Sequence, residues 1–293
     1  MTLSVRQLPV VDKATRRHNR LPGDPGRPLT TSSGTSRRVR VGVGMAMAAW
    51  LVLPFLPLLL WSAADTWRFP SPLPTEWGFA GLSSALSQGG VAAFGRSLGL
   101  GIVVAAIATP LGAILGRALA FGWAPMPRTL SAVLFAPILL PPFAAALGMN
   151  VLLLRAQVPA LVGLALVLVA MAMPYTVFSM RAAYAAHDVG YEDEARTLGA
   201  TRAHVLWRVH VPLLAPALAR SAFLAFLVAW SDYIVTVMIG GGQIVTLPLI
   251  TASAASGVGN DAMVAVLSLA AIVPPLALLF ILGRDRTPAK GAR

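Results

Sequence analysis

The sequence has 293 residues, of which 57% are hydrophobic and only 12% are charged, and its mean hydropathy is +0.74. Because soluble globular domains are about one-quarter charged, this composition excludes an ordinary soluble protein and predicts an all-α polytopic membrane protein, while the absence of cysteine excludes disulfides and thiol chemistry. The net charge of +12 does not indicate nucleic-acid binding, because the basic residues gather in the N-terminal segment and in alternate loops, as is typical of membrane topology.

Residues 1–40 are rich in Arg, Pro, Gly, Ser and Thr and show no apolar period, so we expect a disordered basic cytoplasmic tail. Its last residues, RRVR at 37–40, are interpreted as an orientation signal, with contact to anionic lipid as the alternative. A first transmembrane helix is predicted over 41–63, near the length needed to cross a bilayer. Small residues at 62–64 also fit a signal-peptide cleavage site, but the long tail and long apolar run favour an uncleaved helix.

Beyond the first span, polar and apolar segments alternate. A polar, Pro-rich external loop is predicted at 64–93, with Trp67 and Trp77 as anchors at the membrane interface. Five apolar segments have the length of membrane spans, at about 94–118, 130–154, 160–181, 212–239 and 262–283. Together with the first span they make six transmembrane helices, the last five forming a core over 94–283.

The positions of the basic residues predict the orientation of these spans. If the N-terminus is cytoplasmic, all Lys and Arg residues except Arg68, Arg96 and Arg155 lie on the cytoplasmic side. This bias follows the positive-inside rule, so we expect both termini, including a tail at 284–293, in the cytoplasm.

A polar segment, residues 188–211, interrupts the apolar part of the chain and is followed by Pro212. Asp188 can cap a helix, and the acidic run that follows lies in the first turn, where the helix dipole favours negative charge. Gly199 can end this helix, because glycine adopts the left-handed conformation without a Cβ clash. By the orientation of the spans, the segment is cytoplasmic.

The second half of this segment predicts another short helix. Thr201 can cap its start, and Val205, Leu206 and Val209 give it an apolar stripe. Pro212 either ends this helix or starts the next. The segment therefore predicts an amphipathic helix-turn-helix on the membrane surface, and a solvated loop with ordinary charges is the alternative.

The same segment resembles the cytoplasmic loop of the permease subunits of binding-protein-dependent ABC importers. That loop has the pattern E-A-A, three residues, G, nine residues, I, one residue, L-P. Here Asp193, Glu194 and Ala195 fill the first positions, Gly199 stands at the required distance, and VHVP at 209–212 fills the end. Asp193 and Glu194 replace the Glu and the first Ala, and valines replace Ile and Leu, while the spacing is intact.

The resemblance covers about residues 90–283 and implies a core like that of type I importer permeases, with the first span as a peripheral addition. It implies that the loop docks on a separate ATPase dimer. The residues that it assigns to this coupling contact are Glu192, Asp193, Glu194, Ala195, Gly199, Val209 and Pro212. It further implies an external solute-binding protein and a second permease subunit, either another copy or a homologous chain, as partners in the inner membrane.

Enzymatic alternatives lack the residues they need. Neither of the two lysines, Lys13 and Lys290, ends a glycine-rich phosphate-binding loop, so this chain cannot hydrolyse ATP by that route. We expect no cofactor on this chain and ATP with Mg²⁺ on the partner ATPase. The histidines are confined to the tail and the cytoplasmic loop, and they are His18, His187, His204 and His210. No span holds a histidine for a metal site or for a membrane hydrolase. The other alternative is an ATP-independent carrier or channel, which needs no docking loop.

The predicted fifth span contains the most informative polar residue, Asp232, between Ser231 and Tyr233. It follows Pro212 by twenty residues, which is about 30 Å of helix, so we expect it towards the outer face. An ionised group there usually faces a cavity or a partner charge. We therefore interpret Ser231, Asp232 and Tyr233 as lining the translocation path, with a capped interfacial acid as the alternative.

A glycine turn at 240–242, the sequence TLP at 246–248 and an Asn-Asp step at 260–261 follow this acid. Their order resembles the polyamine, iron(III), thiamine and phosphonate branch of these permeases more than the sugar branch. The resemblance therefore implies a small charged solute, and a sugar-type permease is the alternative.

Overall fold

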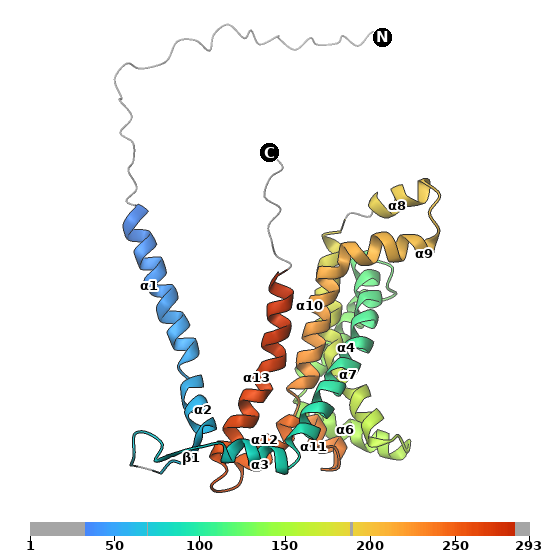
Figure 1. The fold of residues 1–293 in the computed structure, drawn as a ribbon. Coiled ribbons are helices and arrows are strands. Elements are labelled where there is room, and N and C mark those ends of the chain that lie inside the picture. The colour runs from blue at the N-terminus through green and yellow to red at the C-terminus, as the bar shows by residue number, and fades with distance from the viewer. Residues whose placement is uncertain (1–32, 69, 188–189, 285–293) are drawn as a thin grey trace, which may run out of the picture. The chain divides into compact units, whose positions relative to one another are not determined.

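The computed structural model describes residues 33–68, 70–187 and 190–284, and these residues are mostly helical (Figure 1). The chain divides into two compact units, residues 1–53 and 54–293. In the first unit the described element is α1 (Ser33–Val52). Most of the predicted N-terminal tail, all but the first residue of the predicted C-terminal tail, and the predicted cap Asp188 lie outside the described residues.

Two helices stand where a single first span is predicted over 41–63. The first, α1, ends at Val52, and α2 (Phe55–Ser62) begins after Pro54. Proline cannot donate a backbone hydrogen bond and disfavours a helical conformation in the residue before it. The proline therefore accounts for the interruption that the hydropathy pattern does not reveal.

Three long helices form the core of the second unit and lie side by side (Figure 1). They are α4 (Gly90–Ala120), α7 (Ala160–Ala185) and α10 (Val211–Trp230). A Cβ atom added at Gly112 would lie 2.5 Å from the side chain of Thr176, and one at Gly116 would lie 3.0 Å from that of Met180. Because the residue offset is the same in both pairs, α4 and α7 run parallel, and their glycines allow the close approach.

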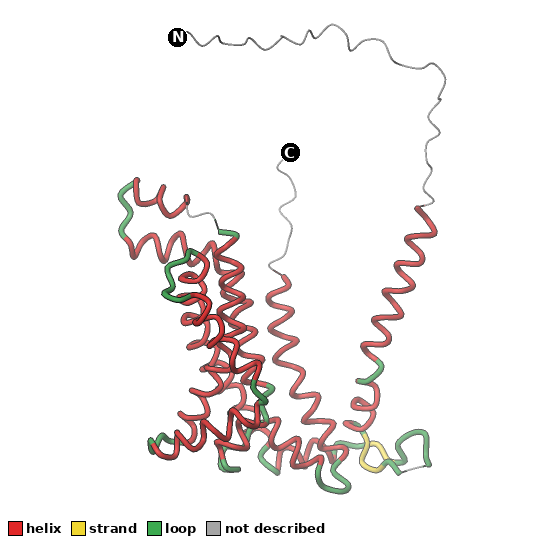
Figure 2. The backbone as a smooth tube through the Cα atoms, turned by 180° about the vertical axis from the view of Figure 1, so that it is seen from behind, coloured by secondary structure: helices red, strands yellow, loops and turns green. Residues whose placement is uncertain are grey.

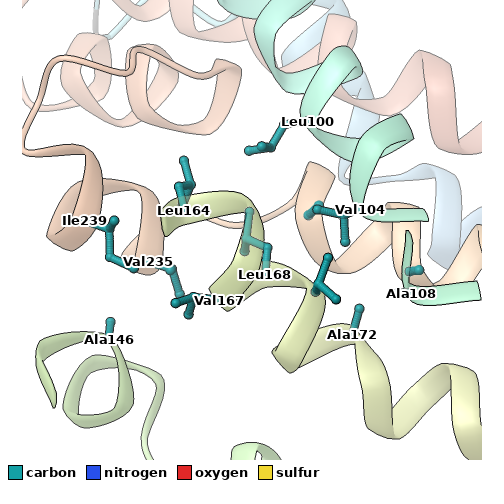
Figure 3. Packing of buried hydrophobic residues seen from close by; sticks show 13 residues of the cluster. Leu100, Val104, Ala108, Ala146, Leu164, Val167, Leu168, Ala172, Val235 and Ile239 are labelled. Atoms are coloured by element: carbon teal, nitrogen blue, oxygen red, sulfur yellow. The ribbon is translucent and has the colours of Figure 1, made fainter. Parts of the chain in front are cut away.

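The third helix, α10, runs antiparallel to the other two. Its beginning packs at the end of α7, where Leu214 contacts the cluster of Met180 and Tyr184. Farther along α10, the Phe226 ring fills the space beside Gly101 of α4. Between the helices lies the main apolar core (Figure 3), in which α4 side chains such as Leu100 pack against α7, and residues of α6 and α11 pack against α7 as well.

A sharp break replaces the predicted continuous span over 130–154. The helix axis bends by 107° between α5 (Pro127–Leu139) and α6 (Pro142–Arg155). Leu140 and Pro141 are extended, with ψ of 138° and 129°, because each precedes a proline. Since α4 and α7 run parallel, this bent pair must carry the chain from the end of α4 back to the start of α7. It therefore serves as one broken crossing.

The last long helix, α13 (Asp261–Arg284), contacts α2, α3 and α12 and is tied to α10 by a 2.9 Å hydrogen bond from Trp230 Nε1 to the Ala271 carbonyl. Short elements lie at the same end of the second unit as its beginning (Figure 1). They are the antiparallel strands β1 (Ala64–Thr66) and β2 (Glu76–Trp77), and the helices α3 (Ala80–Ser87), α11 (Ile234–Gly240) and α12 (Leu247–Ala255). The predicted loop at 64–93 thus holds a hairpin, a short helix and the first turn of α4.

Among the described residues, four helices are long and apolar enough to cross a membrane, and counting each of the two bent pairs as one span gives six. This count confirms the predicted fold class of a six-span helical membrane protein. We call the end of the second unit where α4, α7 and α13 finish and α10 begins the loop end. The hairpin, α3, α11 and α12 lie at the opposite end, as the view from behind also shows (Figure 2).

Candidate functional site

At the loop end, α8 (Gly190–Thr197) and α9 (Arg202–Val205) form the predicted pair of short helices. Gly199 separates them with φ of 86°. Its N–H donates to the Arg196 carbonyl, and the Ala200 N–H donates to the Ala195 carbonyl, which together make a Schellman ending. Thr201 Oγ1 accepts from the His204 N–H at 3.3 Å. The predicted helix ending at Gly199 and the predicted helix cap at Thr201 are therefore confirmed.

The second short helix does not end before the membrane, as a separate surface helix would. It continues through a π-helical turn, η2 (Leu206–His210), into α10, so that one helix runs from Arg202 to Trp230. The chain changes direction around η2 (Figure 1). Pro212 follows this turn, and in a regular helix its ring would clash with the carbonyl four residues earlier. The wider π turn thus accommodates Pro212 without a break.

A buried carboxylate joins this loop to the long helices. Glu192 on α8 is 3% exposed. Its Oε2 accepts from Arg117 Nη2 of α4 at 2.9 Å, and its Oε1 lies 2.6 Å from His210 Nδ1 of η2. His187 Nε2, just past α7, lies 3.5 Å from the same Oε1, and the Tyr184 hydroxyl lies 2.9 Å from His210 Nε2. We call these five residues the Glu192 anchor.

The electrostatics of the anchor favour an ionised carboxylate. Burial raises the pKa of Glu192, but the hydrogen bond with His210 and the positive charge of Arg117 outweigh it, so that the pKa lies below its usual range. The Arg117 guanidinium also lies 5.5 Å from the Trp123 ring centroid and 5.9 Å from that of Phe121. One charged network therefore holds the first turn of α8 against the ends of α4 and α7.

The remaining residues of the predicted coupling contact face outward. Asp193 and Glu194 are exposed on α8, and Ala195 is half-buried. Leu198, beside the turn, is 88% exposed, and Trp207 in η2 is 68% exposed. The sequence predicts polar contacts to a partner from all three acids, but the structure places only the second and third on the free surface. Glu192 faces the protein instead.

The half-buried residue Val209 and the exposed residue Pro212 lie where the loop helix enters the membrane span. They do not share the outward face of α8, from which the turn at Gly199 separates them. Their place at the junction agrees with a role in directing the helix.

The predicted path residues lie at a helix break rather than inside a span. The predicted span over 212–239 is interrupted, because α10 ends at Trp230 and α11 begins at Ile234. Asp232 accepts from the Thr236 N–H at 2.8 Å, from Thr236 Oγ1 at 2.9 Å and from the Val235 N–H at 3.3 Å. The capped-acid interpretation therefore describes its hydrogen bonds, since the carboxylate satisfies the first N–H groups of α11.

The same acid also lines a hollow of about 510 Å³. Ser231, Asp232 and Tyr233 form one wall, and Tyr175 of α7 contributes from another. The kink between α5 and α6 completes the lining. Both tyrosines are 43% exposed. The structure thus brings the three predicted path residues together with an aromatic side chain and a helix break that the sequence did not associate with them.

Sequence reasoning missed the partners of Glu192. Arg117 is 75 positions from Glu192 and His210 is 18 positions away, and neither spacing forms a local pattern. The one available signal was that His187 and His210 flank the polar segment at its two junctions with apolar spans. Only the antiparallel packing of α7 and α10 shows that these junctions meet.

A model of the family described as "Binding-protein-dependent transport system inner membrane component" matches residues 97–285. The diacetylchitobiose uptake system permease protein DasC of Streptomyces coelicolor is 36% identical over 124 residues, which are 41% of this chain and 44% of that protein. ORF1 of Streptomyces antibioticus, named as an ABC transporter permease protein, is 30% identical over 143 residues, 47% of this chain and 58% of that protein. The matches span about half the length of these curated relatives.

A solved structure has a similar arrangement of helices. A chain of a bacterial ABC transporter involved in the import of the acidic polysaccharide alginate matches with a TM-score of 0.63 and 18% sequence identity. The match covers 88% of this chain and 99% of that one. At this identity the likeness shows a common fold and nothing about the solute.

Proposed function

Because this chain belongs to the family of binding-protein-dependent transport system inner membrane components, we propose that it forms one half of the solute path of an ABC importer and couples that path to a separate ATPase. The observation that carries the proposal is the helix pair α8–α9, which is anchored on one side by Glu192 and exposed on the other. The family consists of transport subunits, so the chain is a membrane permease and not an enzyme.

The outward face of the helix pair has the chemistry of a docking surface. Asp193 and Glu194 provide negative charge, and the large apolar side chains of Leu198 and Trp207 are exposed to solvent. Exposed apolar groups rimmed by charge are typical of protein contacts. We assign this face to a pair of ATPase subunits, which bind ATP and Mg²⁺ and lie on the cytoplasmic side.

The anchor explains how movement of the loop would reach the membrane. Glu192 holds α8 to Arg117 at the end of α4 and to His210 in η2, and His187 and Tyr184 belong to the end of α7. The loop is therefore joined to all three core helices and is not a flexible connection. When ATP closes the ATPase pair, these helices tilt together and change access to the path.

The comparisons favour the sugar-type alternative over the small charged solute expected from the sequence. DasC carries the name of an uptake system for diacetylchitobiose, which is a sugar-type solute. The hollow fits a saccharide, because two tyrosine rings offer flat apolar faces and Asp232 offers carboxylate oxygens that can accept from hydroxyl groups. We therefore propose a small saccharide as the solute.

The remaining features follow the family arrangement. A solute-binding protein delivers the solute to the opposite end, and a second permease subunit, a homologous chain or another copy, completes the path between two such cores. Both termini lie in the cytoplasm, in accordance with the distribution of Lys and Arg. Lipid surrounds the apolar helices.

Co-purification tests the coupling contact. The tagged chain is extracted gently, and the ATPase recovered with it is measured for the wild type and for the double variant Asp193→Lys, Glu194→Lys. Reversing two exposed charges at a docking surface should lower recovery by about tenfold or more. Glu76→Lys, an exposed acid on β2 at the opposite end, is the matched control and should leave recovery unchanged.

Two outcomes would overturn the coupling assignment. One is equal recovery of the ATPase with the double variant and the control. The other is transport by the chain alone in liposomes, which would identify an ATP-independent carrier.

The binding protein recovered with the complex identifies the solute when it is heated with saccharides, polyamines, thiamine and iron(III) in turn. A bound solute raises its melting temperature, and a shift with a polyamine but with none of the saccharides would reinstate the charged-solute branch.

A further inference from the structure

Three potential metal-binding atoms meet inside the Glu192 anchor. Nε2 of His187 lies 3.5 Å from Oε1 of Glu192, and Nδ1 of His210 lies 2.6 Å from the same oxygen. One potential ligand atom from each of the three residues lies within 4.8 Å of the others. The three side chains are only 8%, 4% and 8% exposed. Two imidazoles and one carboxylate in an enclosed space form a donor set that suits zinc and neighbouring divalent metals.

One of these atoms lacks the partner that burial normally requires. Among the described residues, Nε2 of His187 makes no hydrogen bond, although it is enclosed. Glu192 Oε1 lies 3.5 Å from this atom, and His210 already engages that oxygen at 2.6 Å. Buried polar atoms are nearly always paired, and an exception often marks a missing ion or ligand. The His187 ring is therefore shielded from water, and its unpaired Nε2 lies close to the Glu192 carboxylate.

The surrounding residues orient the other two donors. The Tyr184 hydroxyl occupies Nε2 of His210, which leaves Nδ1 facing Glu192. Arg117 occupies Oε2 of Glu192, which leaves Oε1 facing the histidines. Metal ligands are usually held in this way, through their far atoms, by hydrogen bonds from neighbouring groups. Arg117 adds a positive charge nearby, and the ionised carboxylate between it and the site offsets that charge.

We propose that His187, Glu192 and His210 bind a divalent metal ion of the zinc type. Ligand atoms in a tetrahedral zinc site with bonds of about 2.0–2.1 Å lie about 3.3 Å apart. The His187 to Glu192 distance is 3.5 Å, so this edge is already formed. The 2.6 Å edge to His210 is a hydrogen bond, and the metal takes the place of its proton as the two atoms move apart by less than an ångström. His210 then carries its proton on Nε2, which donates to the Tyr184 hydroxyl oxygen. Water takes the fourth position.

The consequence is a metal link between three elements. His187 follows α7, Glu192 lies in the first turn of α8, and His210 is the last residue of η2. A bound ion fixes the loop to its two junctions with the membrane helices. This proposal concerns binding by the chain itself and does not depend on the transport function.

Metal titration of the full-length chain tests the site. The chain is purified through a tag without histidine, stripped with a chelator and titrated with Co²⁺ in detergent. We expect one equivalent to bind with the visible absorption of tetrahedral Co²⁺, and Zn²⁺ to displace it. The variant His187→Gln should weaken binding by more than about tenfold. Because His187 Nε2 makes no hydrogen bond, this variant should keep the metal-free melting temperature of the wild type.

His204→Gln is the matched control, because His204 is an exposed histidine in the same loop. It should bind Co²⁺ as the wild type does, and Zn²⁺ should raise the melting temperature of both but not that of His187→Gln. The proposal is overturned if the wild type shows no stoichiometric tetrahedral Co²⁺ spectrum. It is equally overturned if His187→Gln binds as tightly as the wild type, or if His204→Gln loses the metal to the same extent.

Discussion

Glu192 and Glu194 are two positions apart on α8, yet their surroundings differ completely. Two residues correspond to about 200° of rotation around a helix, so the two side chains point to nearly opposite faces. Glu192 is enclosed among Arg117 and two histidines, and Glu194 is exposed. The acidic run of the sequence is therefore two features, a structural anchor and a part of the outer face.

This difference predicts that the same substitution has a large effect on stability at one position and almost none at the other. Glu192→Gln removes the charge that pairs with Arg117 and should lower the free energy of unfolding by about 1–3 kcal/mol. Glu194→Gln removes an exposed charge and should change it by less than about 0.5 kcal/mol. Thermal unfolding followed by tryptophan fluorescence in the presence of chelator measures both. Similar melting temperatures for the two variants would mean that the anchor contributes no stability.

A glycine is needed at position 199 because the backbone there is left-handed, and not because a side chain would clash with a neighbour. Its φ is 86°, and a Cβ atom added there would meet nothing within 4 Å. Gly199→Val forces a β-branched residue into the left-handed region, at about 1–2 kcal/mol, and should loosen the turn between α8 and α9. Asparagine tolerates this conformation, so Gly199→Asn should recover nearly as much ATPase as the wild type in co-purification, and Gly199→Val clearly less. Equal losses would show that a partner atom needs the space.

Much at this scale was predictable, because capping is local. The sequence predicted the glycine ending of α8 and the threonine start of α9, each of which depends on neighbouring backbone groups. It did not predict the burial of Glu192, because that depends on Arg117 and His210, far away along the chain. Local chemistry identifies turns, and only packing identifies which acid is enclosed.

At the scale of elements, hydropathy predicted where the chain is apolar but not where its helices break. The predicted spans at 130–154 and 212–239 are both interrupted, the first before Pro142 and the second around Asp232. Apolar residues flank both breaks closely, so a hydropathy average over the length of a span does not reveal them. The prolines at the first break and the capping acid at the second were visible in the sequence, but their consequences depend on neighbouring helices that replace the lost backbone contacts.

The π turn η2 sets the rotation of α9 relative to α10. It lies between them without a break in the helix. Deleting the exposed residue Arg208 should convert the turn to regular helix and rotate everything before it by about 100°. Glu192 would then lose His210 and Arg117, so we expect faster amide hydrogen exchange in α8 and less recovered ATPase. Membrane insertion should be normal.

The substitution Arg208→Ala controls for the loss of the side chain. It keeps the residue count and should leave hydrogen exchange in α8 unchanged. A deletion variant with wild-type exchange in α8 would mean that η2 does not set the position of the loop.

At the scale of the whole molecule, the number of crossings was predictable and the pairing of helices was not. Basic residues and apolar lengths indicated six spans and their order. The parallel contact of α4 with α7 through Gly112 and Gly116 has no signature in a single sequence, because small residues permit close packing without selecting a partner. This contact is nevertheless what requires the bent pair α5–α6 to cross the second unit.

Labelling from the two sides of the membrane tests that crossing. The chain has no cysteine, so single cysteines can be introduced without a background. Thr129→Cys, in the first turn of α5, should react with an impermeant reagent only from the cytoplasmic side, and Gln157→Cys, between α6 and α7, only from the outside. Both positions are exposed. Reaction of both from one side would make α5–α6 a re-entrant loop and would reverse the orientation of α7.

The unbroken helix from Arg202 to Trp230 has a mechanical consequence of its own. At 1.5 Å per residue, its arm before the middle of η2 is about 9 Å long, and the arm after it is about 33 Å long. If both arms are stiff and η2 is the fulcrum, the helix is a lever with a gain of between three and four. A displacement of about 1 Å at the loop then becomes a swing of about 3–4 Å at Trp230, beside the hollow that Asp232 lines. A short stroke in the cytoplasm would thus suffice to open or shut a passage near the far surface of the membrane.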